Sequence, residues 1–291
     1  MPLLSAVLNL EGERLDAYIS TGTLGVADTK LDPLIVAKKK RGLLPKAPLP
    51  PGTAPLQGQA QRYADCRRIS LQFAREFGLS AVLGDGSGSV ADRLLTGRLL
   101  IPAYDLTSRL VYWVARATDD HHIKTFNLPR EDRHEAWGLS PTPDCATRSE
   151  VLVGLHLLKR GERAVVVEGP MDAVVCGAGF VATMGASLSL EQAILIASSG
   201  VAEAVILYDP DEAGEKGAAA AFRQLSPLIP CRIARCPAGA DPADLGRSRA
   251  LEVIEQTAVS DVGVRPLGPG KPLRIKDLRP EIGKIDGLKK L

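Results

Sequence analysis

Acidic residues follow three short apolar runs in the middle of this 291-residue chain. Turn-forming residues end each run, and carboxylates stand within a few positions of that end. The acids are Glu168 and Asp172 after the run at 164–167, Asp209 and Asp211 after 204–208, and Asp241 after 231–236. Carboxylates hold hard divalent cations and transfer protons, so these positions are the first candidates for chemistry.

The apolar runs have the length of strands in a parallel sheet, and helical patterns follow them. Parallel strands present their carboxyl ends at one edge of the sheet, where ligands bind. We therefore expect these five carboxylates to converge at that edge. Crowded carboxylates repel one another and need a cation, and an all-oxygen ligand set selects Mg²⁺ or Mn²⁺. The pattern indicates phosphate chemistry.

A structural interpretation competes with this one for each cluster taken singly. Acidic residues commonly begin helices, because a carboxylate accepts hydrogen bonds from the free N–H groups of the first turn. Three clusters after successive strands favour a shared site over three unrelated helix caps.

Residues 151–258 alternate regularly between strand and helix patterns, which predicts a compact parallel sheet with helices on both faces. The expected strands lie at 164–167, 181–184, 204–208 and 231–235. The expected helices lie at 151–158, 171–176, 190–198, 214–225 and 243–254, with Ser189 and Gln192 at capping-box spacing.

Residues 61–150 predict a smaller, basic α+β domain. A helical pattern covers 60–77, two strand-like runs at 98–105 and 110–116 predict a hairpin, and 121–127 adds an extended segment. The loop at 84–89 is rich in glycine but lacks the spacing and the lysine of a phosphate-binding loop. His121 and His122 are expected on the surface. Residues 1–60 form an amino-terminal extension with a proline-rich linker, and 259–291 form a basic tail.

Overall charge is nearly balanced, at +2, but basic residues gather towards both ends. They lie at 38–46 and in the tail, and also at Arg62, Arg67, Arg68 and Arg75. Such flanks suit a polyanion. The five cysteines form no C-x-x-C pair, so no zinc is expected. The sequence carries neither a secretory signal nor an apolar run of membrane-spanning length, and we expect a cytoplasmic protein without membrane contact.

The acidic motifs resemble those of the Toprim domain, and more narrowly the version in bacterial DnaG-type primases. Glu168 matches the family's glutamate after the first strand, and Asp172 matches its aspartate four residues later. Asp209 and Asp211 match the Asp-x-Asp pair. Asp241 matches the first aspartate of the last motif, but Ala243 stands where a second is usual, and Asp244 follows it, so Asp244 is not assigned to the site.

The upstream segments resemble the same primases, in the same order. The strand from Arg98 to Asp105 looks like the family's basic strand, Arg116 stands at an arginine of the next strand, and 124–127 resembles a Lys-Tyr-x-Asn segment. The resemblance implies nucleotide or DNA contacts by Arg98, Arg116, Lys124 and Asn127. It implies a metal site at Glu168, Asp172, Asp209, Asp211 and Asp241, with Glu168, Asp209 and Asp211 as the catalytic residues.

The function implied by the resemblance is that of a DNA primase, which synthesises short RNA primers on single-stranded DNA from nucleoside triphosphates. The zinc ribbon usual in that family is missing, which favours a minimal, phage- or plasmid-encoded form. A replicative helicase or a separate zinc-ribbon protein is then a candidate partner. Two alternatives stay open: a Toprim nuclease, and a catalytically inactive DNA-binding module of replication.

Overall fold

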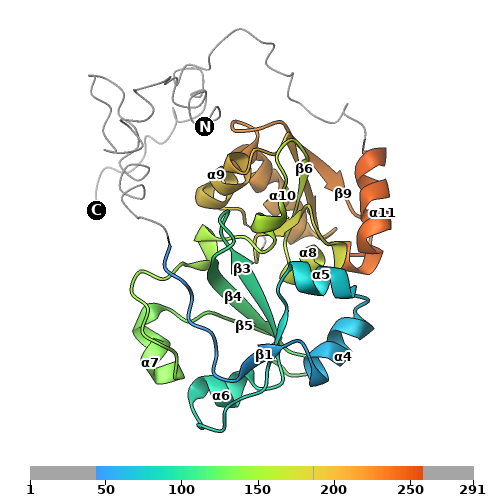
Figure 1. Cartoon of the computed structure of the whole chain (residues 1–291). Helices are drawn as coiled ribbons and strands as arrows, with labels where there is room; N and C mark the ends of the chain where they lie inside the picture. Colours follow the sequence, from blue (N-terminus) through green and yellow to red (C-terminus); the bar gives the residue numbers. More distant parts are fainter. Residues whose placement is uncertain (1–43, 186, 258–291) are drawn as a thin grey trace, which may run out of the picture. The chain divides into compact units, whose positions relative to one another are not determined.

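A computed structural model describes residues 44–185 and 187–257, which all fall within one compact unit. Two sheets organise this part of the chain, one antiparallel and one parallel (Figure 1). The basic stretch at 38–41 and the predicted tail at 259–291 lie outside the described residues.

The antiparallel sheet has five strands in the order β1-β2-β3-β4-β5. They are β1 (Thr53–Pro55), β2 (Ser80–Val82), β3 (Leu99–Tyr104), β4 (Leu110–Arg116) and β5 (Thr125–Asn127). Strands β3 and β4 form the predicted hairpin, and both are rich in the large apolar side chains that favour strands. The proline-rich segment packs on this sheet instead of standing free as a linker. Trp113 Nε1 donates a hydrogen bond to the carbonyl oxygen of Pro48 at 2.7 Å, which fixes the segment against β4.

Short helices surround this sheet. They are α4 (Gly58–Cys66), α5 (Leu71–Glu76), α6 (Val90–Leu95), α7 (His134–Trp137) and the 3₁₀ turns η1 (Glu131–Arg133) and η2 (Arg148–Glu150). The prediction of a single helix at 60–77 was wrong, because a non-helical segment at 67–70 separates α4 from α5. Arg68 has a φ of 57°, and Ser70 starts α5 by accepting a hydrogen bond from Phe73 N at 3.1 Å.

The glycine-rich loop at 84–89 folds around a carboxylate of the chain itself. Asp92 accepts backbone N–H groups of Asp85, Gly86 and Gly88 at 2.9, 3.4 and 3.0 Å. The bond from Asp85, followed by that from Gly88, lowers the pKa of Asp92. The N–H groups that a phosphate would need are therefore already paired.

The second sheet is parallel throughout, with the order β7-β6-β8-β9. Its strands are β6 (Arg163–Val167), β7 (Phe180–Ala182), β8 (Glu203–Tyr208) and β9 (Cys231–Arg235). The predicted parallel sheet flanked by helices is confirmed. Strand β7 ends earlier than expected, because Met184 has a φ of 63°, a conformation that interrupts a strand.

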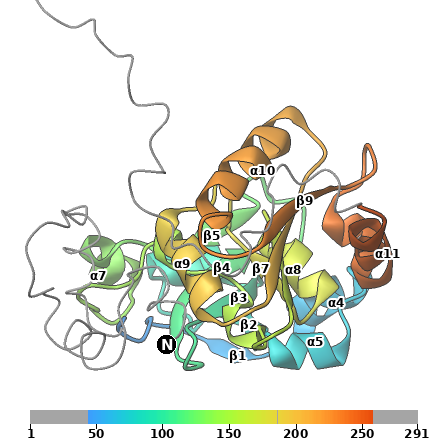
Figure 2. The ribbon, with the colours of Figure 1, turned by 90° about the horizontal axis from the view of Figure 1, so that it is seen from above.

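Four helices cover the parallel sheet, two on each face (Figure 2). Helices α8 (Pro170–Cys176) and α11 (Pro242–Gln256) pack together on one face, and α9 (Leu190–Ser198) and α10 (Glu212–Leu225) on the other. The predicted capping box of α9 is present, with Gln192 N bonded to Ser189 Oγ at 3.0 Å. None of the helices in the described part of the chain is long and apolar enough to cross a bilayer.

The helix expected at 151–158 is absent. Val153 instead pairs with Ala182 at the edge of the sheet, with backbone N–O distances of 3.2 and 2.9 Å, and a single 3₁₀ turn, η3 (Leu155–Leu157), follows. Gly154 between them has a φ of 87°, and a Cβ there would stand 2.4 Å from the Phe180 carbonyl oxygen. The backbone groups of Val153 therefore pair with the sheet edge instead of with a helix.

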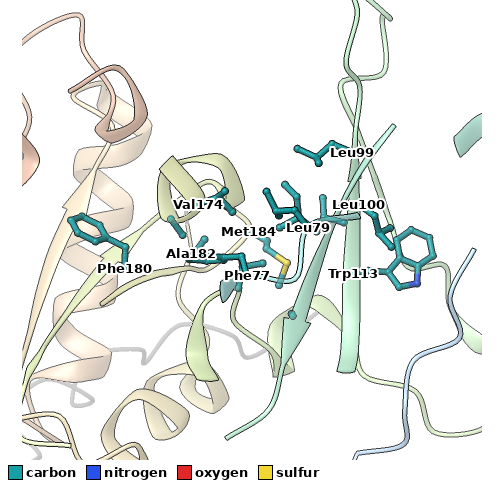
Figure 3. Close-up of a cluster of buried hydrophobic side chains, with 14 of the residues drawn as sticks. Phe77, Leu79, Leu99, Leu100, Trp113, Val174, Phe180, Ala182 and Met184 are labelled. Carbon is teal, nitrogen blue, oxygen red and sulfur yellow. The ribbon is translucent and has the colours of Figure 1, made fainter. Parts of the chain in front are cut away.

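One hydrophobic core joins the two sheets (Figure 3). Phe77, Leu79, Leu99, Leu100 and Trp113 enter it from the antiparallel part, and Val174, Phe180, Ala182 and Met184 enter it from the parallel part. At the same junction, His156 Nε2 lies 3.0 Å from the carbonyl oxygen of Glu76, and its ring packs edge-on against Tyr104. The core fixes the sheets as one body, although the predicted domain boundaries stay a prediction.

Candidate functional site

The five predicted carboxylates stand at the carboxyl edge of the parallel sheet or in the first turn of a helix beside it. Glu168 follows β6 directly and Asp209 follows β8 directly. Asp172 lies in the first turn of α8, and Asp211 and Asp241 precede α10 and α11. The parallel topology therefore brings together residues that are up to 73 positions apart in sequence.

Glu168 and Asp209 stand at the ends of the two central strands of the parallel sheet, β6 and β8. The backbone N of Asp209 lies 3.3 Å from Glu168 Oε1, so the glutamate bridges from the end of β6 to the end of β8. Burial raises the pKa of Glu168, and the charges of Asp209 and Asp211 raise it further. The Glu168 side chain therefore holds its proton more tightly than an exposed glutamate.

Asp209 is half-buried, and its Oδ1 has no hydrogen-bond partner among the described residues. Burial raises the pKa of Asp209 most, and the charges of Asp241, Asp211 and Asp244 raise it further. A buried carboxylate oxygen without a donor is costly, and a bound cation would offset that cost.

Asp172 is the most buried acid of the cluster, at 6% exposed. Burial raises its pKa to about 7, with further contributions from the charges of Asp241 and Asp209. Its two oxygens accept the backbone N–H of Gly169 at 2.9 Å and that of Ala243 at 3.3 Å. Asp172 thus connects the first turns of α8 and α11.

Asp211 and Asp241 also act as helix caps, as the structural interpretation of the sequence expected. Asp211 Oδ1 accepts the N–H of Gly214 at 2.7 Å, and Asp241 Oδ1 accepts that of Asp244 at 2.6 Å. Each cap uses one carboxylate oxygen in this bond. Asp244 stands near enough to raise the pKa of Asp209, although the sequence did not assign it to the site.

The residue types fit a hard divalent cation, since every side-chain donor is a carboxylate oxygen and Asp209 carries an unpaired one. Within residues 44–185 and 187–257, however, no three His, Cys, Asp or Glu side chains are arranged so that they could hold one metal ion together. Hydrogen bonds to helix N–H groups orient Asp172, Asp211 and Asp241. The charge of Asp211 nevertheless raises the pKa of Glu168 and of Asp209, and the charge of Asp241 raises that of Asp172 and of Asp209, so the five carboxylates lie in one cluster.

Arg98, one of the predicted ligand contacts, is buried and bonded to the protein itself. Its Nε donates to the Leu94 carbonyl at 2.8 Å, one terminal nitrogen donates to the Ile123 carbonyl at 3.0 Å, and the other lies 3.2 Å from His121 Nδ1. The guanidinium also covers the Phe126 ring at 4.6 Å. Its placement is that of a residue that anchors the loop at 119–123, so its contact with a ligand stays a prediction.

The same contacts correct the interpretation of His121 as a plain surface residue. Its ring meets Arg98 on one side and stacks on His122 at 4.4 Å between ring centres. The pattern gave no sign of this, because the arginine is 23 positions away in sequence.

Arg116 and Lys124 are brought together at a cavity of about 270 Å³ beside the antiparallel sheet. Its lining is Tyr63, Arg67, Arg116, Ala117, Thr118, Asp119, Asp120 and Lys124. Asn127 lies apart from this lining, on β5, where it pairs with Val114 of β4. Tyr63 was missed from the sequence, and Arg67 was noticed only as part of a basic stretch.

Comparisons with known proteins agree with this geometry. Residues 165–245 match the Toprim-like family. This Toprim-like segment contains the carboxyl ends of all four parallel strands, β6, β7, β8 and β9, and every predicted metal ligand.

Known DNA primases are similar to the chain beyond the Toprim-like segment. It is 32% identical to the DNA primase of Deinococcus radiodurans over 167 residues, which is 54% of this chain and 27% of that protein. It is 28% identical to the DNA primase of Synechococcus elongatus over 226 residues, 72% of this chain and 29% of that protein. The matches thus span less than a third of the length of these curated relatives.

The fold is also that of solved primase cores. A structure of the DnaG primase catalytic domain bound to ssDNA superimposes with a TM-score of 0.56 at 21% identity, over 69% of this chain and 72% of that chain. The Toprim-like parallel sheet beside a smaller α+β part is therefore confirmed as the architecture.

Proposed function

We propose that this protein is a DNA primase that synthesises short RNA primers on single-stranded DNA. The observation that carries the proposal is the gathering of Glu168, Asp209, Asp211 and Asp241 at one sheet edge, in a chain similar to DNA primases. Four interacting carboxylates at the end of a buried sheet suit a nucleotidyl-transfer site.

The reaction joins two nucleotides. The 3′-oxygen of one bonds to the α-phosphorus of the next, the bond from that phosphorus to the pyrophosphate oxygen breaks, and the hydroxyl proton leaves. The raised pKa of Glu168 suits a carboxylate that takes this proton on Oε1 or Oε2. Glu168, Asp172, Asp209, Asp211 and Asp241 are the residues that would hold Mg²⁺ or Mn²⁺, which would neutralise the triphosphate charge when bound.

We assign the binding of template and nucleotide phosphates to the basic residues of the antiparallel part. Arg116 and Lys124 face a cavity and are placed to bind them, arginine through paired donors and lysine as a point charge. Arg98 and Asn127 complete the predicted set; Arg98 acts by holding the loop at 119–123 next to that cavity.

The biological setting proposed is DNA replication in the cytoplasm. A replicative helicase or a separate zinc-ribbon protein is a candidate partner for start-site choice and coupling to the replication fork. Adding each candidate partner to a primer-synthesis reaction and sequencing the primers tests these associations.

Replacing Asp209 by Asn tests the site directly. The variant keeps a side chain of the same shape but removes the charge at the centre of the cluster, so primer synthesis from nucleoside triphosphates should fall at least about 100-fold. Glu215→Gln is the matched control, since it removes an exposed charge one turn into α10 and should leave synthesis unchanged. Full synthesis by Asp209→Asn would contradict the site assignment.

The same preparation separates the alternatives. Incubation with single-stranded DNA and Mg²⁺ but no nucleotides would yield shortened DNA if the carboxylates hydrolyse phosphodiesters, and the protein would then be a nuclease. A calorimetric titration without any Mg²⁺ or Mn²⁺ binding, together with absent synthesis, would support the inactive DNA-binding module.

A further inference from the structure

The carboxyl edge of the parallel sheet carries a buried phenol that the proposed reaction does not use. Tyr208 is the last residue of β8 and directly precedes Asp209. The side chain is 3% exposed, and its hydroxyl oxygen has no hydrogen-bond partner among the described residues. Buried hydroxyls without a partner are rare in folded proteins, because they destabilise the fold. The position of this one at the sheet edge points to a role in the site.

The register of the sheet places Tyr208 beside Glu168. Strands β6 and β8 run parallel with Val166 opposite Ile206, and the same register two residues further along sets Glu168 opposite Tyr208. Residues in register on neighbouring parallel strands direct their side chains to the same face of the sheet. For the glutamate this is the face of α10, since a Cβ on Gly214 would stand 2.9 Å from Glu168 Oε1. The phenol and the carboxylate are therefore neighbours on one face.

Thr183 takes the corresponding position on the other side of Glu168. Strand β7 pairs in parallel with β6, and the register continues from Ala182 to set Thr183 opposite Glu168. The Thr183 hydroxyl donates to the Gly185 carbonyl, and the Gly185 N–H donates to the Glu168 carbonyl at 3.2 Å. These bonds fix the backbone of Glu168, whereas its carboxylate accepts the Asp209 N–H at a long 3.3 Å.

The electrostatics of Tyr208 agree with this placement. Burial raises the pKa of Tyr208, the nearby Thr183 hydroxyl lowers it, and the charge of Glu168 raises it. The phenol therefore lies near both side chains. The two hydroxyls nevertheless form no hydrogen bond of normal geometry, and that of Thr183 directs its proton to Gly185. The Tyr208 O–H is thus a free donor next to the Glu168 carboxylate.

We propose that Tyr208 is a positioning residue for Glu168, whose carboxylate accepts a hydrogen bond from the phenol when the cluster holds a divalent cation. This bond would give the buried hydroxyl its missing partner and would fix the direction in which the carboxylate faces. Carboxylates that bind metal ions are commonly oriented by such a donor, and the loss of the donor lowers metal affinity about 10–100-fold. The inference rests on the cation site of the proposed function and adds to it a residue that binds no cation itself.

Calorimetric titration with Mn²⁺ alone, without DNA or nucleotides, tests the role. Tyr208→Phe keeps the ring and removes only the hydroxyl, so it should bind Mn²⁺ about tenfold more weakly than the wild type. Tyr112→Phe is the matched control, because it removes the hydroxyl of an equally buried tyrosine on β4 of the antiparallel sheet. Its affinity should equal that of the wild type. Equal affinities of the two variants would overturn the inference.

Urea unfolding in EDTA distinguishes a positioning role from a structural one. The Tyr208 hydroxyl has no partner in the structure, so Tyr208→Phe should be at least as stable as the wild type when no cation is bound. A hydroxyl that only supports the fold predicts the reverse, a lower urea midpoint and an unchanged Mn²⁺ affinity. A midpoint below that of the wild type would show a structural partner and would count against the positioning role.

A double-mutant cycle tests whether Tyr208 acts through Glu168. Glu168→Asp keeps the charge but withdraws the carboxylate by one methylene, so the contact with the phenol should already be lost in this background. Adding Tyr208→Phe to it should then weaken Mn²⁺ binding less than about twofold. The same loss in both backgrounds would show that Tyr208 acts independently of Glu168, and the inference would be wrong.

These measurements separate the inference from the proposed function, because none of them depends on primer synthesis. If Tyr208→Phe weakens Mn²⁺ binding as expected while the wild type makes no primer, the role of Tyr208 stands and the primase proposal fails. If the wild type makes primer but Tyr208→Phe binds Mn²⁺ like Tyr112→Phe, the primase proposal stands and the inference fails. The inference also fails if the wild type binds no Mn²⁺.

Discussion

Asp172 has the least ordinary surroundings of any acid in the described chain. It is nearly covered, it lies close to the charges of Asp241 and Asp209, and it accepts N–H groups from the starts of two helices. Hydrogen bonds to the ionised form lower its pKa, but burial and the neighbouring acids outweigh them. The side chain therefore holds its proton up to near neutral pH.

This balance predicts a pH-dependent stability. The folded protein holds the Asp172 proton up to about pH 7, whereas an unfolded chain releases it near 3.8, so the folded state loses stability as pH rises between those values. In EDTA, the free energy of unfolding of the wild type should fall relative to Asp172→Asn by up to about 3 kcal/mol between pH 5 and pH 8. Urea unfolding at both pH values measures the difference; a difference that does not change with pH would contradict the assignment.

At the scale of elements, the two edges of the parallel sheet carry opposite electrostatic arrangements. The carboxyl edge gathers acids that repel one another, whereas the amino edge pairs its charges. There Arg163 bonds to Glu203 and to Glu255, and Arg232 Nε lies 3.7 Å from Glu203. Arg232 also donates to the carbonyls of Ile254 and Thr257 at 2.8 and 3.2 Å, which closes the end of α11. The ion pairs and hydrogen bonds at the amino edge stabilise the fold and offset the repulsion among the carboxylates at the other edge.

Replacing Arg232 by Ala should therefore lower the free energy of unfolding by about 2–4 kcal/mol, because it leaves helix carbonyls and a carboxylate without their buried partner. The matched control is Arg249→Ala on α11, whose ion pair with Glu252 is exposed and should be worth less than about 0.5 kcal/mol. Urea unfolding of both variants gives the comparison. Equal losses would show that Arg232 contributes no more than a surface charge.

At the scale of the whole described molecule, the shared core ties the basic part to the carboxylate part. Arg247 of α11 reinforces it: one of its nitrogens donates to the carbonyls of Cys176 and Ala178 at 2.6 and 2.8 Å. Its guanidinium also lies 5.8 Å from the ring centres of Phe73 in α5 and Phe180 in β7. The side chain therefore contacts both parts at once.

Such a core predicts one cooperative unfolding transition. Both tryptophans of the chain, Trp113 and Trp137, lie in the basic α+β part, whereas far-ultraviolet circular dichroism reports the helices of both parts. The two signals should therefore follow the same curve against urea. Two separated transitions would show that the parts unfold independently.

The sequence was sufficient where the signal is local. Strand runs and the acids behind them predicted the parallel sheet, and the spacing of Ser189 and Gln192 predicted the start of α9. It failed where a distant partner decides the outcome. Val153 exchanges two backbone hydrogen bonds with Ala182, and Arg98 is covered by the ring of Phe126 and donates to the carbonyl of Ile123.

The cavity shows the same limit. Tyr63 and Arg116 are 53 positions apart, and no periodicity links them. The fold alone brings them together, so the sequence gave no sign that this tyrosine lines a cavity. Arg67 carried a weak signal, as one of several basic residues, which could not be told from a solvated surface charge.

Because Asp211 and Asp241 each begin a helix as well as facing the cluster, any ligand they bound would share a carboxylate that already holds a helix end through one of its oxygens. A cation that drew either carboxylate away from its N–H partner would loosen the first turn of α10 or α11, so occupancy of the site is thermodynamically linked to helix fraying. Alanine at either position would remove a cap worth about 1 kcal/mol together with a charge, whereas asparagine would remove the charge alone. We therefore expect most substitutions of Asp211 or Asp241 to weaken a helix start, the charge of the cluster, or both.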